Sequence, residues 1–142
     1  MRSYLIVANQ TLGGEELGAA IEARLAEGPV RFHVVVPLSP VQHRLTWDEE
    51  ESRMAAAERL AAIVDRLRSR GAEAAGEVGD RDPVDAARDA LRRIEVDEVI
   101  LSTLPAGRSR WLGQDVPSRL RKAVDVPVVV VTQVRAPAAQ NA

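Results

Sequence analysis

Side chains that could bind a ligand gather in two segments, each directly after a short apolar run. The first segment is Asn9, Gln10 and Thr11, and the second runs from 102 to 115. The second segment offers hydroxyl, amide and guanidinium groups, and guanidinium groups bind phosphate or carboxylate through paired N–H donors. The ligand-binding candidates are Asn9, Gln10, Thr11, Val36, Ser102, Thr103, Gly107, Ser109, Arg110, Gln114 and Asp115.

Ordinary structural roles compete with ligand binding at several of these positions. Arg108 and Arg110 flank Ser109 and could grip an anion or could simply be solvated. The hydroxyl groups of Ser102 and Thr103 could contact a ligand, but hydroxyls at strand ends also bond local backbone groups. The residues alone leave both interpretations open.

The sequence offers no recognisable catalytic or metal constellation. It contains no cysteine, which excludes disulfides, thiolate catalysis and sulfur-ligated metals. His33 lies inside an apolar run, where a core or strand-edge role is expected, and no carboxylates accompany it or His43 at zinc-ligand spacing. No nucleophile stands beside a recognisable base. We therefore expect neither enzymatic activity nor a metal.

Length and composition indicate one globular domain. The chain has 142 residues, 46% of them apolar and 28% charged, with a formal net charge of -2. Acidic and basic residues are interleaved, so the chain lacks the broad basic field that nucleic acid requires. The apolar run Tyr4–Ala8 is too short for a signal core or a membrane span. We expect a cytoplasmic protein that binds neither nucleic acid nor membrane, with a folded domain at 1–134 and a mobile tail at 135–142.

Apolar runs alternate with amphipathic segments along the chain, which predicts an α/β fold with a parallel sheet. Strands are expected at 4–8, 30–37, 72–78, 97–101 and 126–132. Helices are expected at 15–27, 46–70, 82–94 and 115–124. Right-handed crossovers favour a single doubly wound five-stranded sheet of order 3-2-1-4-5 with helices on both faces. In this order the turn after strand 1 lies beside the loop after strand 4.

Local signals predict where the helices begin and which faces they bury. Thr46-Trp-Asp-Glu49 has the spacing of a capping box. The helix that follows should bury Ala57, Leu60, Ala61, Val64 and Leu67. Asp82 precedes Pro83 in the manner of an N-cap followed by the first helical residue. Asp115 is expected to cap the last helix.

Four segments of the chain match one family pattern. Leu101-Ser-Thr-Leu-Pro-Ala-Gly-Arg-Ser-Arg-Trp-Leu-Gly-Gln-Asp-Val116 matches a ligand loop, and Pro127-Val-Val-Val-Val131 matches a final strand. Val7-Ala-Asn-Gln-Thr11 looks like a Val-Asp-Gly-Ser turn, and Val78-Gly-Asp-Arg-Asp-Pro83 looks like a Gly-Asp-Pro helix start. Together these segments resemble the universal stress protein family across nearly the whole chain. The resemblance implies a Rossmann-like fold of the adenine nucleotide alpha hydrolase-like type and a role in the stress response.

The chain departs from the nucleotide-binding motif of that family. In ATP-binding members, Gly-x2-Gly-x9-Gly-Ser wraps the phosphates, because glycine lets backbone amides approach closely. The corresponding residues here are Leu101, Leu104, Gln114 and Asp115. Asn9 replaces the acidic residue after strand 1, and a one-residue slip would restore only Gly113 to the third glycine position. We expect no cofactor, with ATP or AMP as the less favoured alternative.

The last strand favours pairing with a second copy of the chain. In the predicted order it lies at an edge of the sheet, and it carries no charge between Val126 and Gln133. Universal stress proteins commonly dimerise through this strand, so the resemblance implies the same here. The predicted homodimer interface comprises Val128, Val129, Val130, Val131 and Thr132.

Three functions stay open at this point. We favour a universal-stress-like regulatory or interaction protein with an unidentified protein partner. The second is a stress sensor that holds a nucleotide or another small anion between Asn9, Thr11, the end of strand 2 near Val36 and the loop 102–110. The third is a weak hydrolase or transferase that uses the same crevice.

Overall fold

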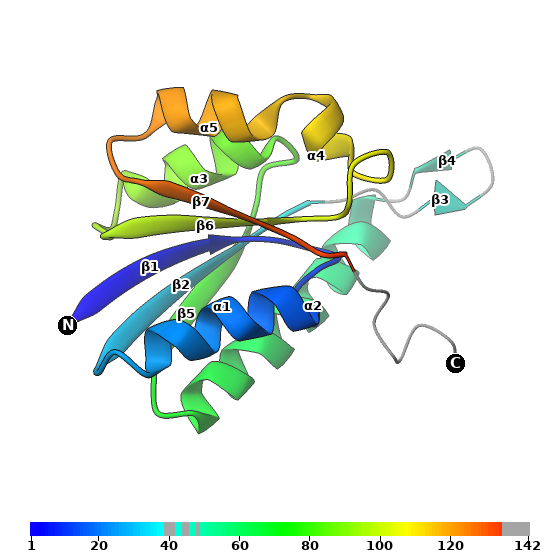
Figure 1. Ribbon diagram of the computed structural model, residues 1–142. Helices are drawn as coiled ribbons and strands as arrows, with labels where there is room; N and C mark the ends of the chain where they lie inside the picture. Colours follow the sequence, from blue (N-terminus) through cyan, green and yellow to red (C-terminus); the bar gives the residue numbers. More distant parts are fainter. Residues whose placement is uncertain (39–41, 44–45, 48, 135–142) are drawn as a thin grey trace.

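Five short segments form one parallel β-sheet (Figure 1). The computed structural model describes residues 1–38, 42–43, 46–47 and 49–134. The strands of the sheet are β1 (Arg2–Val7), β2 (Val30–Pro37), β5 (Glu73–Gly79), β6 (Glu98–Thr103) and β7 (Val128–Thr132). Their order is β5-β2-β1-β6-β7, and every neighbouring pair is parallel. The predicted α/β class and the order 3-2-1-4-5 are confirmed.

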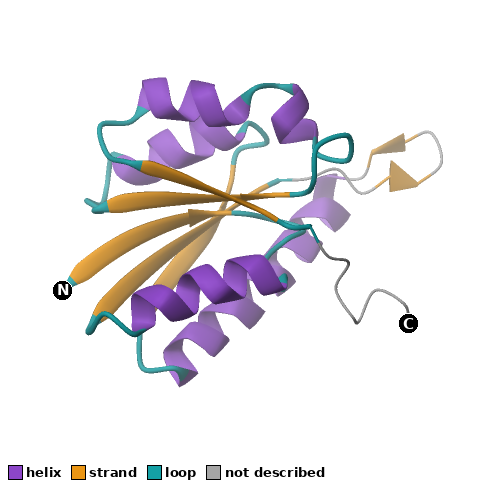
Figure 2. Ribbon diagram, in the orientation of Figure 1, coloured by secondary structure: helices purple, strands orange, loops and turns teal. Residues whose placement is uncertain are grey.

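Helices cover both faces of the sheet, as Figure 2 shows. One face carries α1 (Glu15–Leu25) and α2 (Glu49–Ser69). The other carries α3 (Pro83–Leu91), α4 (Arg110–Gly113) and α5 (Val116–Ala123). Successive side chains of a strand point to opposite faces. The central strand β1 therefore contributes to both cores, with Tyr4 and Ile6 in one and Leu5 and Val7 in the other.

The connection between β2 and α2 differs from the prediction. Thr46 and Trp47 do not open a helix: they form the short strand β4 (Thr46–Trp47), which pairs antiparallel with β3 (Gln42–His43). The helix α2 begins only at Glu49. Threonine and tryptophan both favour extended backbone, and the partner strand lets that preference override the capping-box spacing.

The buried face of α2 is rotated relative to the predicted stripe. Ala57 and Ala61 are exposed, whereas Ala56 and Ile63 are buried together with the predicted Val64 and Leu67. Leu60 is partly buried and packs against the same core. Alanines lie on both sides of this helix, so its sequence gives little contrast between the faces.

The backbone and side-chain geometry supports two of the predicted helix boundaries. At a third, the expected capping hydrogen bond is missing. Asp82 caps α3, accepting hydrogen bonds from the backbone N–H groups of Val84 (2.8 Å) and Asp85 (3.3 Å). Gly71 follows α2 with a φ of 91°, a conformation that glycine adopts without strain. Asp115 precedes α5 with a φ of 55°, but its side chain makes no capping hydrogen bond. The predicted tail at 135–142 lies outside the described residues.

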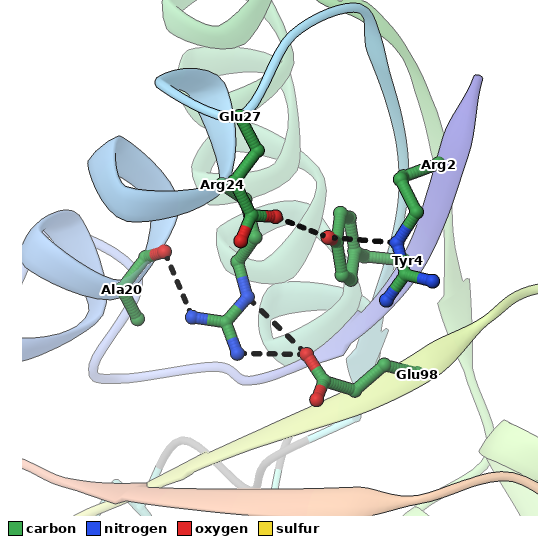
Figure 3. A network of polar contacts seen from close by, with 6 residues as sticks. All are labelled: Arg2, Tyr4, Ala20, Arg24, Glu27 and Glu98. Carbon is green, nitrogen blue, oxygen red and sulfur yellow. Dashed lines mark hydrogen bonds and ion pairs between the residues drawn. The ribbon is translucent and has the colours of Figure 1, made fainter.

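A polar network closes the amino-terminal end of the sheet (Figure 3). Arg24 of α1 donates to Glu98 of β6, with 2.7 Å between Nη2 and Oε1, and the two side chains are 17% and 18% exposed. The Tyr4 hydroxyl donates to Glu27 over 3.2 Å. The guanidinium carbons of Arg2 and Arg24 lie 5.6 and 5.5 Å from the centre of the Tyr4 ring, within cation–π range. The network ties the last turns of α1 to β1 and β6.

Candidate functional site

A buried asparagine holds the turn after β1. Asn9 is 4% exposed. Its side-chain nitrogen donates to the carbonyl oxygen of Pro37 at the end of β2 (2.7 Å). Its side-chain oxygen accepts from Nη1 of Arg59 on α2 (2.6 Å). Asn9 thereby fixes the turn against β2 and α2, and one donor and one acceptor of its amide are already used inside the protein.

A buried pair of hydroxyl groups joins this turn to the end of β6. Thr11 Oγ1 lies 2.5 Å from Ser102 Oγ, and either group can be the donor. Thr103 follows Ser102 in β6, and its hydroxyl lies 3.5 Å from that of Thr132 in β7. Because β1 and β6 are neighbours and parallel, their carboxyl ends lie side by side. The predicted juxtaposition of the two polar segments is therefore present.

The segment after β6 folds over this juncture as a short loop that leads into α4. Gly107 has a φ of 88°, which a residue with a side chain rarely adopts. Ser109 is the N-cap of α4, and its hydroxyl accepts from the backbone N–H of Leu112 (3.1 Å). The local geometry of the loop is thus set by Gly107 and Ser109 before any ligand is considered.

The turn and the loop enclose a small open cavity. Its volume is about 90 Å³. The walls consist of Asn9, Gln10, Thr11, Ser102, Thr103, Leu104, Arg108, Ser109, Arg110 and Trp111. Seven of these residues are among the predicted ligand-binding positions. The cavity has polar walls from the turn and the strand ends, and a wall with indole and guanidinium groups from the loop.

The charge around this cavity is positive. Arg108 and Arg110 line it, and no carboxylate does. Neither guanidinium makes a hydrogen bond or an ion pair with any residue that the structure describes. An arginine without a carboxylate partner is ready to receive an anion. Arg108 and Arg110 can therefore donate N–H hydrogen bonds to a negatively charged group in the cavity.

The described part of the chain shows no metal site and no membrane span. Among these residues, no three His, Asp or Glu side chains gather closely enough to hold a metal ion. No helix in the same ranges is long and apolar enough to cross a bilayer. The polar side chains that line the cavity carry amide, hydroxyl and guanidinium groups.

Solved structures of known proteins share this fold. A universal stress protein family member from Burkholderia pseudomallei is 18% identical, with 91% of this chain and 94% of that chain covered and a TM-score of 0.60. The universal stress protein from Archaeoglobus fulgidus in complex with dAMP is 20% identical, with 92% and 98% covered and a TM-score of 0.57. An Arabidopsis thaliana member with AMP bound is 15% identical, with both chains fully covered and a TM-score of 0.62. The chain has the universal stress protein fold.

Sequence comparison adds nothing to this likeness. No protein-family model matches the chain, and no curated protein does. At identities of 15 to 20%, the structural similarity establishes the fold and no more. The nucleotides belong to the structures from Archaeoglobus fulgidus and Arabidopsis thaliana.

Four residues occupy the positions where the ATP-binding pattern has its three glycines and its serine: Leu101, Leu104, Gln114 and Asp115. Leu101 lies in β6 and is fully buried in the core, and Leu104 forms part of the cavity wall. Gln114 and Asp115 are exposed beyond α4. Their backbone N–H groups donate to Arg110 O (3.0 Å) and Leu112 O (3.2 Å). The backbone N–H groups at the positions that match the third glycine and the serine of the ATP-binding pattern are thus already bonded within the chain.

The structure brings together most of the predicted ligand-binding residues but not all of them. Val36, Gly107, Gln114 and Asp115 do not line the cavity. Val36 of β2 is fully buried in the core between the sheet and the helices α1 and α2. Gly107 bends the loop, and the other two residues follow α4. Their predicted contact with a ligand has no geometric support at this cavity.

Three lining residues were not among the predicted ligand-binding positions. Leu104, Arg108 and Trp111 all belong to the loop after β6. Trp111 also packs beside the core between the sheet and α3 and α5. Arg59 on α2 was missed altogether, because its contact with Asn9 joins residues 50 positions apart that share no motif.

Proposed function

We propose that this chain is a universal-stress-like regulatory protein that does not hold ATP in the manner of the ATP-binding members. One observation carries the proposal: the backbone N–H groups of Gln114 and Asp115 already donate to carbonyl oxygens of α4. A triphosphate would have to break those hydrogen bonds before it could accept new ones. Each broken bond costs about 1 kcal/mol net, and an unsatisfied group costs more.

The size of the cavity supports the same proposal. Pockets that enclose a drug-sized ligand have volumes of about 300 to 1,000 Å³. The cavity at the carboxyl ends of β1 and β6 has about 90 Å³. Leu104 occupies part of the wall where the family pattern has glycine. This space suits one compact anionic group better than a whole nucleotide.

The experiment is a calorimetric and thermal-shift titration with ATP, AMP and cyclic AMP. We expect no saturable heat and no rise in Tm at millimolar ATP. A matched variant with Leu104→Gly, Gln114→Gly and Asp115→Ser restores three positions of the motif and should gain affinity. Micromolar ATP binding by the unmodified chain, or nucleotide that stays with the protein through purification, would refute the proposal.

The regulatory action proposed here runs through association of folded chains. The first proposed partner is a second copy of the chain, paired through β7, which lies at the edge of the sheet. An unidentified protein partner in the cytoplasm completes the proposal. No catalytic step is part of it, and ATP turnover of the chain and of Arg110→Ala should both equal the buffer rate.

A second function is favoured by the two unpaired arginines. Arg108 and Arg110 line the cavity with the hydroxyl of Ser102 nearby, which suits a sensor of a nucleotide phosphate or another small anion. Solved structures with this fold hold dAMP and AMP. Saturable binding of AMP or inorganic phosphate that Arg110→Gln abolishes would support this second function.

A further inference from the structure

A second cavity lies on the other side of Asn9, between the turn after β1 and the helix α2. Its volume is about 230 Å³, and it shares Asn9 and Gln10 with the first cavity. Its α2 wall consists of Arg59, Ala62, Ile63 and Arg66. This spacing of three, four and seven residues places the four side chains on one face of the helix. The second cavity is thus bounded by a continuous helical face and by the polar turn.

The α2 face brings two positive charges to this cavity without a carboxylate. Arg59 bonds the neutral amide of Asn9, and Arg66 makes no side-chain hydrogen bond or ion pair with the residues that the structure describes. No aspartate or glutamate lines the cavity. Glu58 and Asp65 precede the two arginines, but adjacent helical residues point about 100° apart. The cavity therefore holds two guanidinium groups without a counter-charge.

Several arginines elsewhere in the molecule are paired with carboxylates, whereas Arg108 and Arg110 at the first cavity, like Arg66, are not. Carboxylates form ion pairs with Arg24, Arg31, Arg53, Arg70, Arg92, Arg93 and Arg119. The chain as a whole has more acidic than basic residues, with a formal net charge of -2. Carboxylates are thus available to this fold, yet none lines the second cavity. Such a placement favours a negative charge supplied from outside.

The turn adds space and a donor. Gly13 lines the second cavity, and a side-chain carbon built there would meet no atom within 4 Å. The backbone N–H of Gly13 makes no backbone hydrogen bond with the residues that the structure describes. We infer that the second cavity binds a compact oxyanion, a phosphate or a carboxylate group, between Arg59 and Arg66. The inference is independent of the proposed function, because neither arginine lines the first cavity.

The test is an NMR titration of the full chain with inorganic phosphate at constant ionic strength. We expect saturable shifts of the amide signals of Gly13 and Arg66. Arg66→Gln should weaken phosphate binding about tenfold, because it removes a charged donor to the anion. The side chain of Arg66 has no partner among the described residues, so this variant should keep its fold. Arg59→Gln should weaken binding as well, and its amide spectrum reports whether the turn stays in place.

Arg53→Gln is the matched control, because it removes the same charge from the same helix at a residue outside the second cavity. The inference holds if Arg53→Gln binds phosphate as the unmodified chain does while Arg66→Gln does not. Equal weakening in both variants, or shifts that do not saturate, would overturn it. Shifts confined to Ser109 and Trp111 would also overturn it, and would place the anion in the first cavity instead. ATP binding that shifts only those loop residues would refute the proposed function. It would not bear on the second cavity, because the phosphate titration alone decides that inference.

Discussion

The two edges of the sheet are protected to different degrees. At β5, Glu73 and Glu77 place charges along the strand, and Glu77 is bonded to His33 (2.8 Å) and Arg93. At β7, the residues from Val128 to Thr132 are uncharged and all partly exposed. Charges on an edge strand oppose pairing with another strand, and an uncharged edge permits it. The comparison therefore favours β7 over β5 as the edge for the proposed dimer.

Packing distinguishes the edges as well. β5 runs against both α2 and α3. At Gly76, a side-chain carbon would lie 2.4 Å from Val34 O and 2.5 Å from Leu60 Cδ1. β7 also contacts helices, α1 and α5, but it contains no glycine and its five residues are all half-buried. The β5 edge is therefore sensitive to added volume, whereas the β7 edge is sensitive to added charge.

The largest expected effect tests the packing of β5. Gly76→Val should lower the free energy of unfolding by about 2 to 3 kcal/mol, because the backbone of β2 and the side chain of Leu60 must move to admit it. Urea denaturation measures the change. Gly18→Ala in α1 is the control, since a side-chain carbon there meets nothing within 4 Å, and it should stabilise by about 0.5 to 1 kcal/mol. A Gly76→Val variant as stable as the unmodified chain would show that β5 is not tightly enclosed.

The next effect tests β7 as the proposed dimer edge. Val129→Lys should raise the dimer dissociation constant about tenfold or more, which corresponds to about 1.4 kcal/mol, because the new charge must be desolvated on pairing. Sedimentation velocity over a range of concentrations measures it. Ala75→Lys adds the same charge to β5, where Ala75 is exposed, and should leave association unchanged. A chain that stays monomeric at high concentration, or a dimer lost only in the β5 variant, would contradict the proposal.

A smaller effect concerns the charged cluster on β5. Burial by itself raises the pKa of Glu77, but hydrogen bonds from His33 and Arg93 outweigh it, so the pKa lies below its ordinary value of 4.5. A carboxylate with a lowered pKa stabilises the fold above its unfolded pKa and loses that contribution as the pH falls through the folded pKa. Glu77→Gln should cost about 1 kcal/mol at pH 7, a modest figure because Arg93 is largely exposed.

Urea midpoints between pH 7 and pH 3 check this expectation. The unmodified chain should lose stability below about pH 4.5, and the Glu77→Gln chain should lose less over the same interval. Asp82 is a second carboxylate with a lowered pKa, and it is unchanged in the Glu77→Gln chain, so its share of the stability loss should be the same in both chains. Burial alone would raise the pKa of Asp82. Hydrogen bonds from Arg119 and from the backbone N–H groups of Val84 and Asp85 outweigh burial, so the pKa lies below its ordinary value. Parallel pH curves for the unmodified and variant chains would exclude Glu77 as a contributor.

The smallest effect is expected at the outer end of the β5 edge. Arg31 and Glu73 form an ion pair of 3.3 Å with both side chains more than half exposed. Pairs of this kind contribute from nearly zero to about 1 kcal/mol. Glu73→Gln should therefore change the free energy of unfolding by less than about 0.5 kcal/mol. A larger loss in urea denaturation would mean that this edge depends on its outermost charge.

The strand order followed from the sequence because its strongest signals are local. The apolar run of β1 and the glycines that directly follow the expected helices 15–27 and 46–70 are short-range patterns, and both glycines, Gly28 and Gly71, adopt positive φ. Right-handed crossovers then restrict how parallel strands can be ordered. The two-residue strands β3 and β4 escaped prediction because segments so short carry no periodicity.

The candidate site was only partly predictable. The topology placed Thr11 beside Ser102, although the 2.5 Å contact depends on the register of β1 against β6. Asp115 stands at the N-cap position of α5 as expected, but its backbone is left-handed instead of extended and its side chain makes no capping hydrogen bond. The bond from Arg59 to Asn9 links a helix to a distant turn, and no local sequence pattern encodes such a contact.

The polar network around Tyr4 gives the molecule an optical marker at one end. Tyr4 is the only tyrosine in the chain and is 2% exposed. Trp111 lines the first cavity at the opposite end of the sheet. Trp47 is the other tryptophan, so in a Trp47→Phe chain the indole emission comes from Trp111 and responds to an occupant of the first cavity, while the near-ultraviolet circular dichroism of the tyrosine follows the integrity of the fold. A change in indole emission with an unaltered tyrosine signal distinguishes binding from unfolding without any added label.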